Sequence, residues 1–390
     1  MPQRSGYSVD IGQEVTPCER AWVEINQCAL IHNVTQIKQQ LSPQTALMAV
    51  VKADAYGHGA VSVAQTVLEA GASELAVATL GEGVELREAG ISTPILILGA
   101  INSPVEIEAI AHYQLQPTLC TPQQALIFSE MMAKLGQSLP VHLKIDTGMS
   151  RLGTLWYEAT EFVQLVQQLP HLELASVYSH LATADDPNPQ VMQQQHERFQ
   201  TAIANLNQQG IYPPRLHLAN SAATLSDRHL HYDLVRVGLA LYGLYPAPHL
   251  QSVIDLKPVL TVKARVTQVK TIPAGSGVSY GHKFVADQDT RIAVIGIGYA
   301  DGIPRNLSNR LMVLLRGQKI PQIGAITMDQ MMLNVNDLPN VQPGEVVTLI
   351  GKDGENAISA DDWAATLGTI SWEILCSFKH RLPRVTVEKS

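Results

Sequence analysis

The sequence has little positive charge and few aromatic residues. Lys and Arg number 27 against 35 Asp and Glu, which gives a net charge of -8, and aromatic residues make up 5% of the chain. A nucleic-acid partner needs a positive field that attracts its phosphates, and unpaired bases need aromatic faces on which to stack. We therefore expect no nucleic-acid partner.

Paired cysteines, long apolar runs and an apolar leader are also missing. The four cysteines lie far apart and form no C-x-x-C pair, so we expect reduced thiols and neither a disulfide framework nor a zinc site. There is no run of about eighteen apolar residues, so no membrane-spanning helix and no membrane partner are expected. Because residues 1–16 contain no apolar h-region, the chain is predicted to be cytoplasmic.

The length and composition fit a globular protein with more than one domain. The chain has 390 residues, of which 46% are hydrophobic and 16% charged, so it is too apolar for a disordered protein. At about 150 residues per domain, two or three domains are expected. A chain of this size buries enough surface to fold without disulfides or metals.

Residues 17–250 alternate between short apolar runs and longer segments with helical periodicity. Near-continuous apolar strands are typical of a parallel sheet that helices cover. Eight strand–helix units in this length favour an α/β fold of the (β/α)8 type, a TIM barrel, over an open doubly wound sheet. The predicted strands are residues 47–52, 75–79, 95–99, 116–119, 141–145, 174–179, 215–219 and 234–238.

The pattern changes after Tyr245. Strand-like runs separated by Gly and Pro then follow at hairpin spacing, which predicts a mostly β C-terminal domain over residues 251–390. Within it, Ser359 is the predicted N-cap of a helix. The expected organisation is an N-terminal extension (1–16), a cofactor-binding barrel (17–250) and this β-rich domain.

Several reactive side chains fall at the carboxyl ends of the predicted barrel strands, where TIM-barrel active sites lie. They are Lys52, Lys144, Asp146, Arg151, His180, Asn220, Ser221, Arg236 and Gly238. The loops after strands seven and eight of such barrels commonly hold a phosphate, and here they offer the Ser221 hydroxyl and the N–H groups of Gly238 and Leu239. A phosphate pocket that faces a lysine suggests pyridoxal 5'-phosphate, whose aldehyde reacts with lysine amines.

Eight segments carry a resemblance to one enzyme family. Residues 49–59, AVVKADAYGHG, resemble the cofactor-lysine motif of the alanine racemases, which are two-domain fold-type III pyridoxal enzymes. The other matching segments are LKIDTGMSRLG (143–153), SHLATAD (179–185), ANSAATL (219–225), VRVGLALYG (235–243), GSGVSYG (275–281), GYADGIPR (298–305) and GAITMDQM (324–331). They follow the family order over essentially the whole chain.

The resemblance implies a role for each matching residue. Lys52 would anchor the cofactor and act as one catalytic base, and Tyr280 of a partner subunit would be the second base. The cofactor would be held by Lys52, Tyr56, His180, Asn220, Ser221, Arg236, Gly238 and Leu239. Among these, Arg236 would face the pyridine nitrogen, and His180 would lie near the ring and help to tune the second base.

Further roles concern the substrate and the entrance of the site. Arg151 would bridge the ring hydroxyl and the substrate carboxylate, and Met328 of the partner would offer that carboxylate a backbone N–H. Tyr299 and Arg305 would line the entrance. A shared site of this kind implies a homodimer.

Lys144 resembles a position that is carbamylated in many family members. A carbamate would turn the lysine into an anion and give Arg151 a bidentate partner. The alternative is an unmodified Lys144 paired with Asp146.

The chemistry of racemisation is consistent with these roles. A proton leaves one face of the α-carbon and another arrives on the opposite face, so two bases on opposite sides are natural. An arginine beside the ring nitrogen would keep that nitrogen unprotonated, since guanidinium does not release its proton. The resemblance therefore implies interconversion of L- and D-alanine, which supplies D-alanine for peptidoglycan.

Two positions depart from the family pattern. His380 stands where some members place a tyrosine against the phosphate, and Thr327 replaces a cysteine before the Met–Asp pair. The first departure puts one phosphate contact in doubt.

Alternative functions remain open at this stage. The chain could racemise another small amino acid such as serine, decarboxylate an amino acid, or bind pyridoxal phosphate without catalysis. The segment GVSYG (277–281) also fits the G-x-S-x-G motif of serine hydrolases, with Ser279 as nucleophile, but loop-like sequence flanks it on both sides.

Overall fold

The computed structural model describes residues 20–388, so the expected N-terminal extension lies outside the described residues. The chain divides into two compact units. The barrel unit contains residues 24–261, 360–377 and 386–388, and the β unit contains residues 20–23, 262–359 and 378–385. Among the described residues, no helix is both long enough and apolar enough to cross a membrane.

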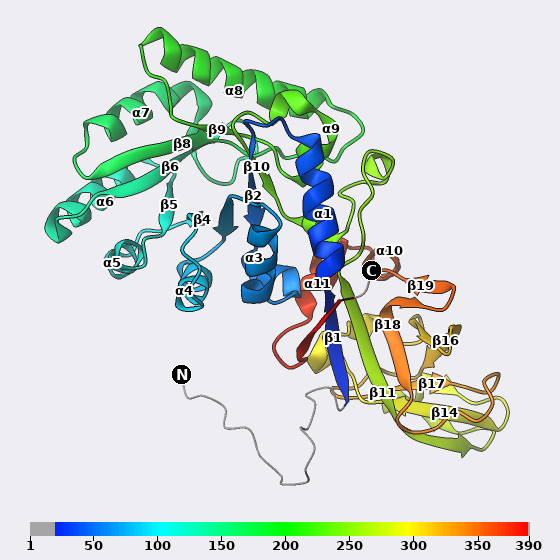
Figure 1. Ribbon diagram of the computed structural model, residues 1–390. Helices are drawn as coiled ribbons and strands as arrows, with labels where there is room; N and C mark the ends of the chain where they lie inside the picture. Colours follow the sequence, from blue (N-terminus) through cyan, green and yellow to red (C-terminus); the bar gives the residue numbers. More distant parts are fainter. Residues whose placement is uncertain (1–19, 389–390) are drawn as a thin grey trace. The chain divides into compact units, whose positions relative to one another are not determined.

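The barrel unit contains a nearly closed barrel of eight parallel strands, in the order β10-β2-β3-β4-β5-β6-β8-β9 (Figure 1). Their bounds are β2 Ala46–Val50, β3 Glu74–Val77, β4 Ile95–Ala100, β5 Gln116–Leu119, β6 Leu139–Asp146, β8 Leu172–Tyr178, β9 Leu216–His217 and β10 Leu234–Val237. Most of their residues are buried, because helices cover the outside and strand side chains fill the interior. The TIM barrel predicted from the sequence is confirmed.

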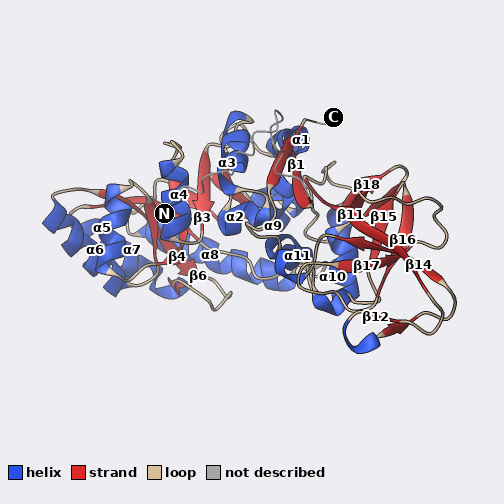
Figure 2. Ribbon diagram, turned by 90° about the horizontal axis from the view of Figure 1, so that it is seen from below, coloured by secondary structure: helices blue, strands red, loops and turns tan. Residues whose placement is uncertain are grey.

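Helices lie outside these strands and connect them (Figure 2). They are α1 Gln27–Gln40, α3 Ala60–Glu69, α4 Leu80–Glu88, α5 Pro104–His112, α6 Pro122–Leu135, α7 Ala159–Gln168, α8 Gln190–Gln208 and α9 Ser221–Ser226. Local sequence explains their ends. Thr79 and Glu82 form a capping box at the start of α4, and α6 begins with a Thr121 cap followed by proline and ends at a left-handed Gly136.

A nine-stranded sheet in the order β19-β18-β15-β16-β17-β14-β11-β1-β20 lies mostly in the β unit, although β1, β11 and β20 also include residues of the barrel unit. Its strands are β1 Ala21–Asn26, β11 Leu260–Ile272, β14 Thr290–Ile295, β15 Met312–Leu315, β16 Gln318–Ile323, β17 Met331–Asn334, β18 Val346–Asp353, β19 Asn356–Ile358 and β20 Arg384–Val387. A separate two-stranded sheet joins β12 Gly277–Val278 to β13 Phe284–Val285. The mostly β C-terminal region is confirmed.

Short elements complete the fold. They are β7 Thr154–Leu155, the turn α2 Lys52–Gly57, helices α10 Ala360–Leu367 and α11 Ser371–Ser377, and the single turns η1 Trp156–Glu158, η2 Arg228–Leu230, η3 Leu239–Tyr242, η4 Pro248–Leu250, η5 Tyr280–His282, η6 Tyr299–Asp301 and η7 Arg305–Leu307. Helix α10 begins directly after Ser359, as predicted. Helices α10 and α11 belong to the barrel unit although they follow the β unit in sequence.

Candidate active site

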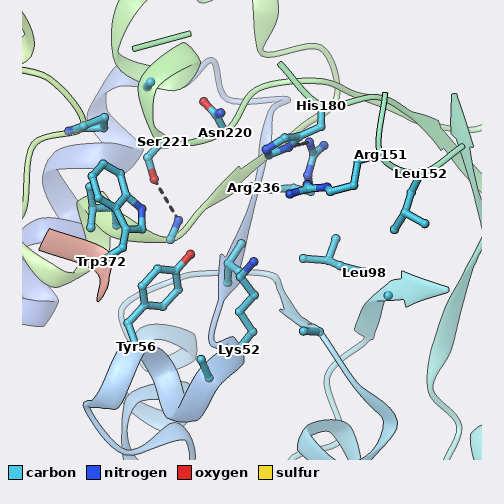
Figure 3. Close-up of a pocket in the computed structure, with 18 of the residues that line it drawn as sticks. Lys52, Tyr56, Leu98, Arg151, Leu152, His180, Asn220, Ser221, Arg236 and Trp372 are labelled. Carbon is cyan, nitrogen blue, oxygen red and sulfur yellow. Dashed lines mark hydrogen bonds between the residues drawn. The ribbon is translucent and has the colours of Figure 1, made fainter. Parts of the chain in front are cut away.

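One cavity of about 550 Å³ in the barrel unit collects every barrel residue that the sequence marked for the cofactor or substrate (Figure 3). These residues are Lys52, Tyr56, Lys144, Arg151, His180, Asn220, Ser221, Arg236, Gly238 and Leu239. They come from the carboxyl ends of different strands, which is where a TIM barrel places its site. The side chains of Lys52 and Tyr56 rise from one wall, and Arg151, His180 and Arg236 lie across from them.

Lys52 opens a turn with an unusual backbone. The four residues after it, Ala53 to Tyr56, have φ values of 54°, 54°, 51° and 55°, which form a left-handed helical turn made without glycine. Such a conformation costs about 1–2 kcal/mol per residue, because the Cβ approaches the following carbonyl oxygen. Strain of this size persists only where the surroundings hold it, and it is typical of functional sites.

Two carboxylates hold the strained turn. Glu82 Oε1 accepts from the Ala53 N–H at 2.7 Å, while its Oε2 accepts from the Ala78 N–H at 2.7 Å. Asp54 Oδ1 accepts from the Ala60 N–H at 2.8 Å. Charged acceptors make stronger hydrogen bonds than neutral ones. The turn is therefore fixed at both ends, which fixes the backbone that carries Lys52 and Tyr56.

The environment of Lys52 favours its uncharged amine. Burial is the main cause that lowers the pKa of Lys52, and the positive charge of Arg151 lowers it further. Glu82 and Cys376 act in the opposite direction and are weaker. An uncharged amine is the form that reacts with an aldehyde and that accepts a proton.

Gly238, Tyr56 and Ser221 form a cradle for an oxyanion. A Cβ on Gly238 would lie 2.6 Å from the Tyr56 hydroxyl, so only glycine leaves this space open. Ser221 Oγ accepts from the Gly238 N–H at 3.1 Å, and the Asn220 side chain caps α9 by accepting from the Ala223 N–H at 3.0 Å. Hydroxyls and backbone N–H groups around a small residue suit a phosphate, so the pocket fits pyridoxal phosphate.

Arg236 lines the cavity and is buried. Its Nη2 donates to the Ser179 carbonyl at 2.7 Å and lies 3.3 Å from His180 Nδ1, and its Nη1 lies 2.7 Å from His217 Nδ1. Burial lowers the pKa of Arg236 to about 10, so the guanidinium stays charged at neutral pH. Burial and the surrounding cations hold the pKa of His180 well below its ordinary value, so this imidazole is neutral.

Lys144 is buried against the ring of Tyr178. Its Nζ lies 4.5 Å from the centre of the Tyr178 ring, and burial lowers its pKa well below the ordinary value. Among the described residues it forms no ion pair with Asp146, whose Oδ1 accepts instead from the Gly148 and Ser150 N–H groups at 2.8 and 3.1 Å. The simple Lys144–Asp146 pair is therefore not observed.

The other predicted residues belong to the β unit and are turned to solvent in the single chain. Tyr280 on η5 is 73% exposed, Met328 is 52% exposed and Tyr299 on η6 is 42% exposed. Tyr299 and Met328 lie on adjoining segments, because the Ala300 N–H donates to the Met328 carbonyl at 3.0 Å. Arg305 begins η7.

The serine hydrolase alternative finds no support in the geometry. Ser279 Oγ donates to the Ala325 carbonyl at 2.8 Å, and the residue lies between β12 and the single turn η5. A nucleophile elbow needs a strand before the serine and a full helix after it.

Tyr178, Trp372 and Cys376 also line the cavity, although the sequence did not mark them as site residues. Trp372 and Cys376 line it from α11, which reaches the barrel from the far end of the chain. Strand and helix periodicity does not indicate that a segment so late in the chain packs in the barrel unit. The Ser371-Trp-Glu-Ile-Leu-Cys run is helical in pattern, but only the structure shows that it packs in the barrel unit, beside α2.

Two family models match consecutive parts of the chain. The model described as alanine racemase, N-terminal domain, matches residues 25–246, and the model described as alanine racemase, C-terminal domain, matches residues 259–386. The chain belongs to the alanine racemase family. The resemblance read from its eight sequence segments is thereby confirmed.

Individual alanine racemases are close relatives. The chain is 68% identical to the alanine racemase of a Synechocystis species, over 95% of this chain and 99% of the relative, and 66% identical to that of a Nostoc species, over 95% and 96%. The crystal structure of the Bacillus anthracis alanine racemase with bound L-Ala-P superposes with a TM-score of 0.89 at 36% identity and covers 95% of both chains. A histidine racemase from Leuconostoc mesenteroides has a TM-score of 0.87 at 31% identity.

These relationships decide the general function. Alanine racemases are pyridoxal 5'-phosphate-dependent isomerases, so the expected reaction, enzyme class and cofactor are confirmed. The histidine racemase shows that this fold alone does not select the substrate, whereas the high identity to alanine racemases over nearly the full chain favours alanine.

Proposed function

We propose that this alanine racemase uses Lys52 and Tyr280 as its two bases, one on each face of the substrate α-carbon. The observation that carries the proposal is the convergence of the predicted barrel residues on one cavity, around a lysine whose pKa is lowered. When bound, pyridoxal phosphate supplies the electron sink that makes the α-proton of an amino acid labile. The residues of the chain decide where that proton goes.

Lys52 removes or returns the proton on the face from which it rises. Its uncharged amine can accept a proton, and the clamped left-handed turn keeps its backbone in place for the next turnover. Tyr280 acts on the opposite face. Because removal and return use different residues, the product has the opposite configuration.

Several residues hold the cofactor and the substrate. Tyr56, Ser221 and the N–H groups of Gly238 and Leu239 would bind the phosphate, and Asn220 caps the helix that begins at Ser221. Arg236 would donate to the ring nitrogen and keep it unprotonated. Neutral His180 would contribute to the pocket of the ring.

Arg151 supplies the positive charge that recognises the substrate carboxylate. It lines the cavity and has no hydrogen bond or ion pair within the described part of the chain, so its guanidinium is available for that carboxylate. Lys144, buried with a lowered pKa, is the kind of amine that adds carbon dioxide, and the resulting carbamate would be the bidentate partner of Arg151.

The active enzyme is a homodimer in which each site combines the barrel of one subunit with Tyr280 and Met328 of the other. The exposure of these side chains supports a partner that covers them. Tyr299 and Arg305 line the entrance in this arrangement. Residues 17–250 bind the cofactor and residues 251–390 deliver the second base, as expected from the sequence. Residues 360–377 are the exception, because they belong to the barrel unit. The enzyme is cytoplasmic and supplies D-alanine for peptidoglycan.

The direct test is proton NMR of L-alanine in deuterated water with the purified protein and pyridoxal phosphate. We expect loss of the α-proton signal together with formation of D-alanine, and slower exchange with L-serine. Exchange of serine as fast as that of alanine would contradict alanine selectivity. If the protein holds the cofactor but exchanges no α-proton of alanine, the proposed function is wrong.

A further inference from the structure

A continuous chain of hydrogen bonds runs through the barrel interior behind Arg236. Arg236 Nη1 lies 2.7 Å from His217 Nδ1, and His217 Nε2 lies 2.7 Å from Ser176 Oγ. Ser176 Oγ lies 2.6 Å from His142 Nδ1, and His142 Nε2 lies 2.8 Å from Gln116 Oε1. These five residues stand on β10, β9, β8, β6 and β5, and His217, Ser176 and His142 are at most 1% exposed.

The donors and acceptors of this chain can be assigned from its first member. A guanidinium has only donors, so His217 Nδ1 must accept, and the proton of this neutral ring is then on Nε2. His217 Nε2 donates to Ser176 Oγ, so the Ser176 hydroxyl must direct its own proton to His142 Nδ1. His142 therefore carries its proton on Nε2 and donates to Gln116, whose amide oxygen ends the chain.

Burial, and after it the cations around the chain, keep both imidazoles neutral. The cations that face them are Arg236, Lys144 and Arg215, and Arg215 is paired with Glu74 at 2.5 Å. The Tyr178 ring stacks on His217 with centroids 4.6 Å apart, so no anion approaches from that side. A second proton on His217 would place an N–H against the Arg236 guanidinium, which can only donate.

We propose that Gln116, His142, Ser176 and His217 form a polarised relay that positions Arg236 for the cofactor ring. The relay rests on the role proposed above for Arg236. His217 Nδ1, the last atom of the relay, accepts from Nη1, while the carbonyls of Ser179 and Leu218 accept from Nη2 at 2.7 and 3.1 Å. The N–H of Nε and the second N–H of Nη1 have no partner among the described residues, and these remain for a ligand atom in the cavity.

Gln116 is the residue that sets the direction of the relay, although it does not touch the cavity. Without an acceptor at this position, His142 can take its other tautomer and donate to Ser176. The Ser176 hydroxyl then turns to His217, whose proton moves to Nδ1 and opposes Arg236. His142 and Gln116 are thus positioning residues, which act on the reaction through Arg236.

The first test reads the tautomers directly, by NMR of the wild-type holoenzyme labelled with ¹⁵N-histidine. We expect His142 and His217 to be neutral, with the proton on Nε2 in both, and unchanged between about pH 6 and about pH 8. A proton on Nδ1 of either residue, or titration in this range, overturns the relay. This measurement does not depend on turnover, so it separates failure of the relay from failure of the proposed function.

The second test compares two substitutions. Gln116→Met removes the terminal acceptor, and we expect kcat to fall by about ten- to a hundredfold with little change in KM for alanine, and His142 to lose its single tautomer. Gln124→Met, the matched control, removes another buried glutamine of the barrel unit, which donates to the Ile101 carbonyl at 3.1 Å and lies outside the relay.

The control variant should keep both tautomers and most of its kcat. The relay is wrong if Gln116→Met keeps the wild-type kcat, or if Gln124→Met lowers kcat as strongly.

Discussion

At the scale of single residues, the tightest geometric requirement of the site is the missing side chain of Gly238. Its α-carbon stands against the Tyr56 hydroxyl, and its N–H donates to Ser221 Oγ at 3.1 Å. The close approach lets a tyrosine hydroxyl, a serine hydroxyl and backbone N–H groups share one small volume. Larger residues at this position would fill the space needed by the phosphate.

Gly238→Ala should therefore weaken cofactor binding. The added Cβ would lie 2.6 Å from the Tyr56 hydroxyl, so the tyrosine must move out of the cradle. We expect the dissociation constant for pyridoxal phosphate to rise by about tenfold or more, since one hydrogen bond to a charged group is lost. Gly81→Ala is the control, because a Cβ there meets nothing within 4 Å. Wild-type affinity of Gly238→Ala in a fluorescence titration would contradict this account of the cradle.

The residues of the barrel site could be predicted because strand ends are readable from sequence. Lys52 ends a predicted strand, Arg151 and His180 each follow one, and parallel strands bring their carboxyl ends to one edge of the barrel. Trp372 could not be predicted in this way, since nothing in its own segment indicates which unit it joins. The roles of the exposed Tyr280 and Met328 came from the family resemblance alone.

At the scale of elements, the left-handed turn α2 joins a strained backbone to a reactive side chain. Its cost is offset by the carboxylate of Glu82, which accepts from the N–H groups of Ala53, Ala78 and Thr79 at 2.7, 2.7 and 3.1 Å. One carboxylate thus connects the turn to the end of β3 and the start of α4. Loss of this carboxylate should release the turn before it disturbs the barrel.

Glu82→Ala should lower both stability and activity. We expect the free energy of unfolding to fall by about 2 kcal/mol, because backbone donors lose a charged acceptor, and kcat to fall as Lys52 loses its fixed backbone. Urea unfolding and steady-state kinetics measure the two effects. Glu108→Ala, which alters an exposed glutamate of α5, serves as the control. A variant with the wild-type kcat would show that Glu82 does not maintain the turn.

The sequence predicted the repeating elements well and the exceptional ones poorly. All eight barrel strands were found, because buried parallel strands leave near-continuous apolar runs, and even the short Gln116–Leu119 strand was placed correctly. Residues 53–56 were not recognised as a left-handed turn, since they contain no glycine and tertiary hydrogen bonds stabilise the conformation. Strand β1 was missed because its partners lie far along the sequence.

At the scale of the whole molecule, buried histidines make stability depend on pH. Burial lowers the pKa of His142 from 6.5 to about 3 and holds those of His180 and His217 well below 6.5. Below pH 6.5 the unfolded chain binds protons that the folded chain does not bind. The contribution of these histidines to the free energy of unfolding is therefore complete above this pH and is lost as the pH falls toward 3.

We expect the free energy of unfolding to decrease by a few kcal/mol between about pH 7.5 and about pH 5.5, since each such histidine contributes up to about 1.4 kcal/mol per pH unit once below its unfolded pKa. Urea unfolding of the holoenzyme at both pH values, followed by circular dichroism, measures the change. Equal free energies would mean that these histidines are not buried in the neutral form.

A shared site predicts complementation between inactive subunits. When Lys52→Ala and Tyr280→Phe proteins are mixed and allowed to exchange subunits, half of the dimers are hybrids and each hybrid has one intact site. About a quarter of the wild-type activity should therefore return. Mixing Lys52→Ala with Arg151→Ala, both in the barrel unit, should restore nothing. Absence of recovery in the first mixture, with hybrids shown by native mass spectrometry, would contradict the shared site.

The central claim is that Lys52 and Tyr280 serve opposite faces of the α-carbon, and α-proton exchange by the Tyr280→Phe variant in deuterated water tests it most directly. Overall racemisation must slow equally in both directions, because the equilibrium between enantiomers is fixed, so the measurement follows exchange without inversion. We predict that D-alanine still exchanges its α-proton through Lys52 and keeps its configuration, while L-alanine keeps its proton. Equal exchange of both enantiomers, or equal loss of exchange, would contradict the assignment of one base to each face.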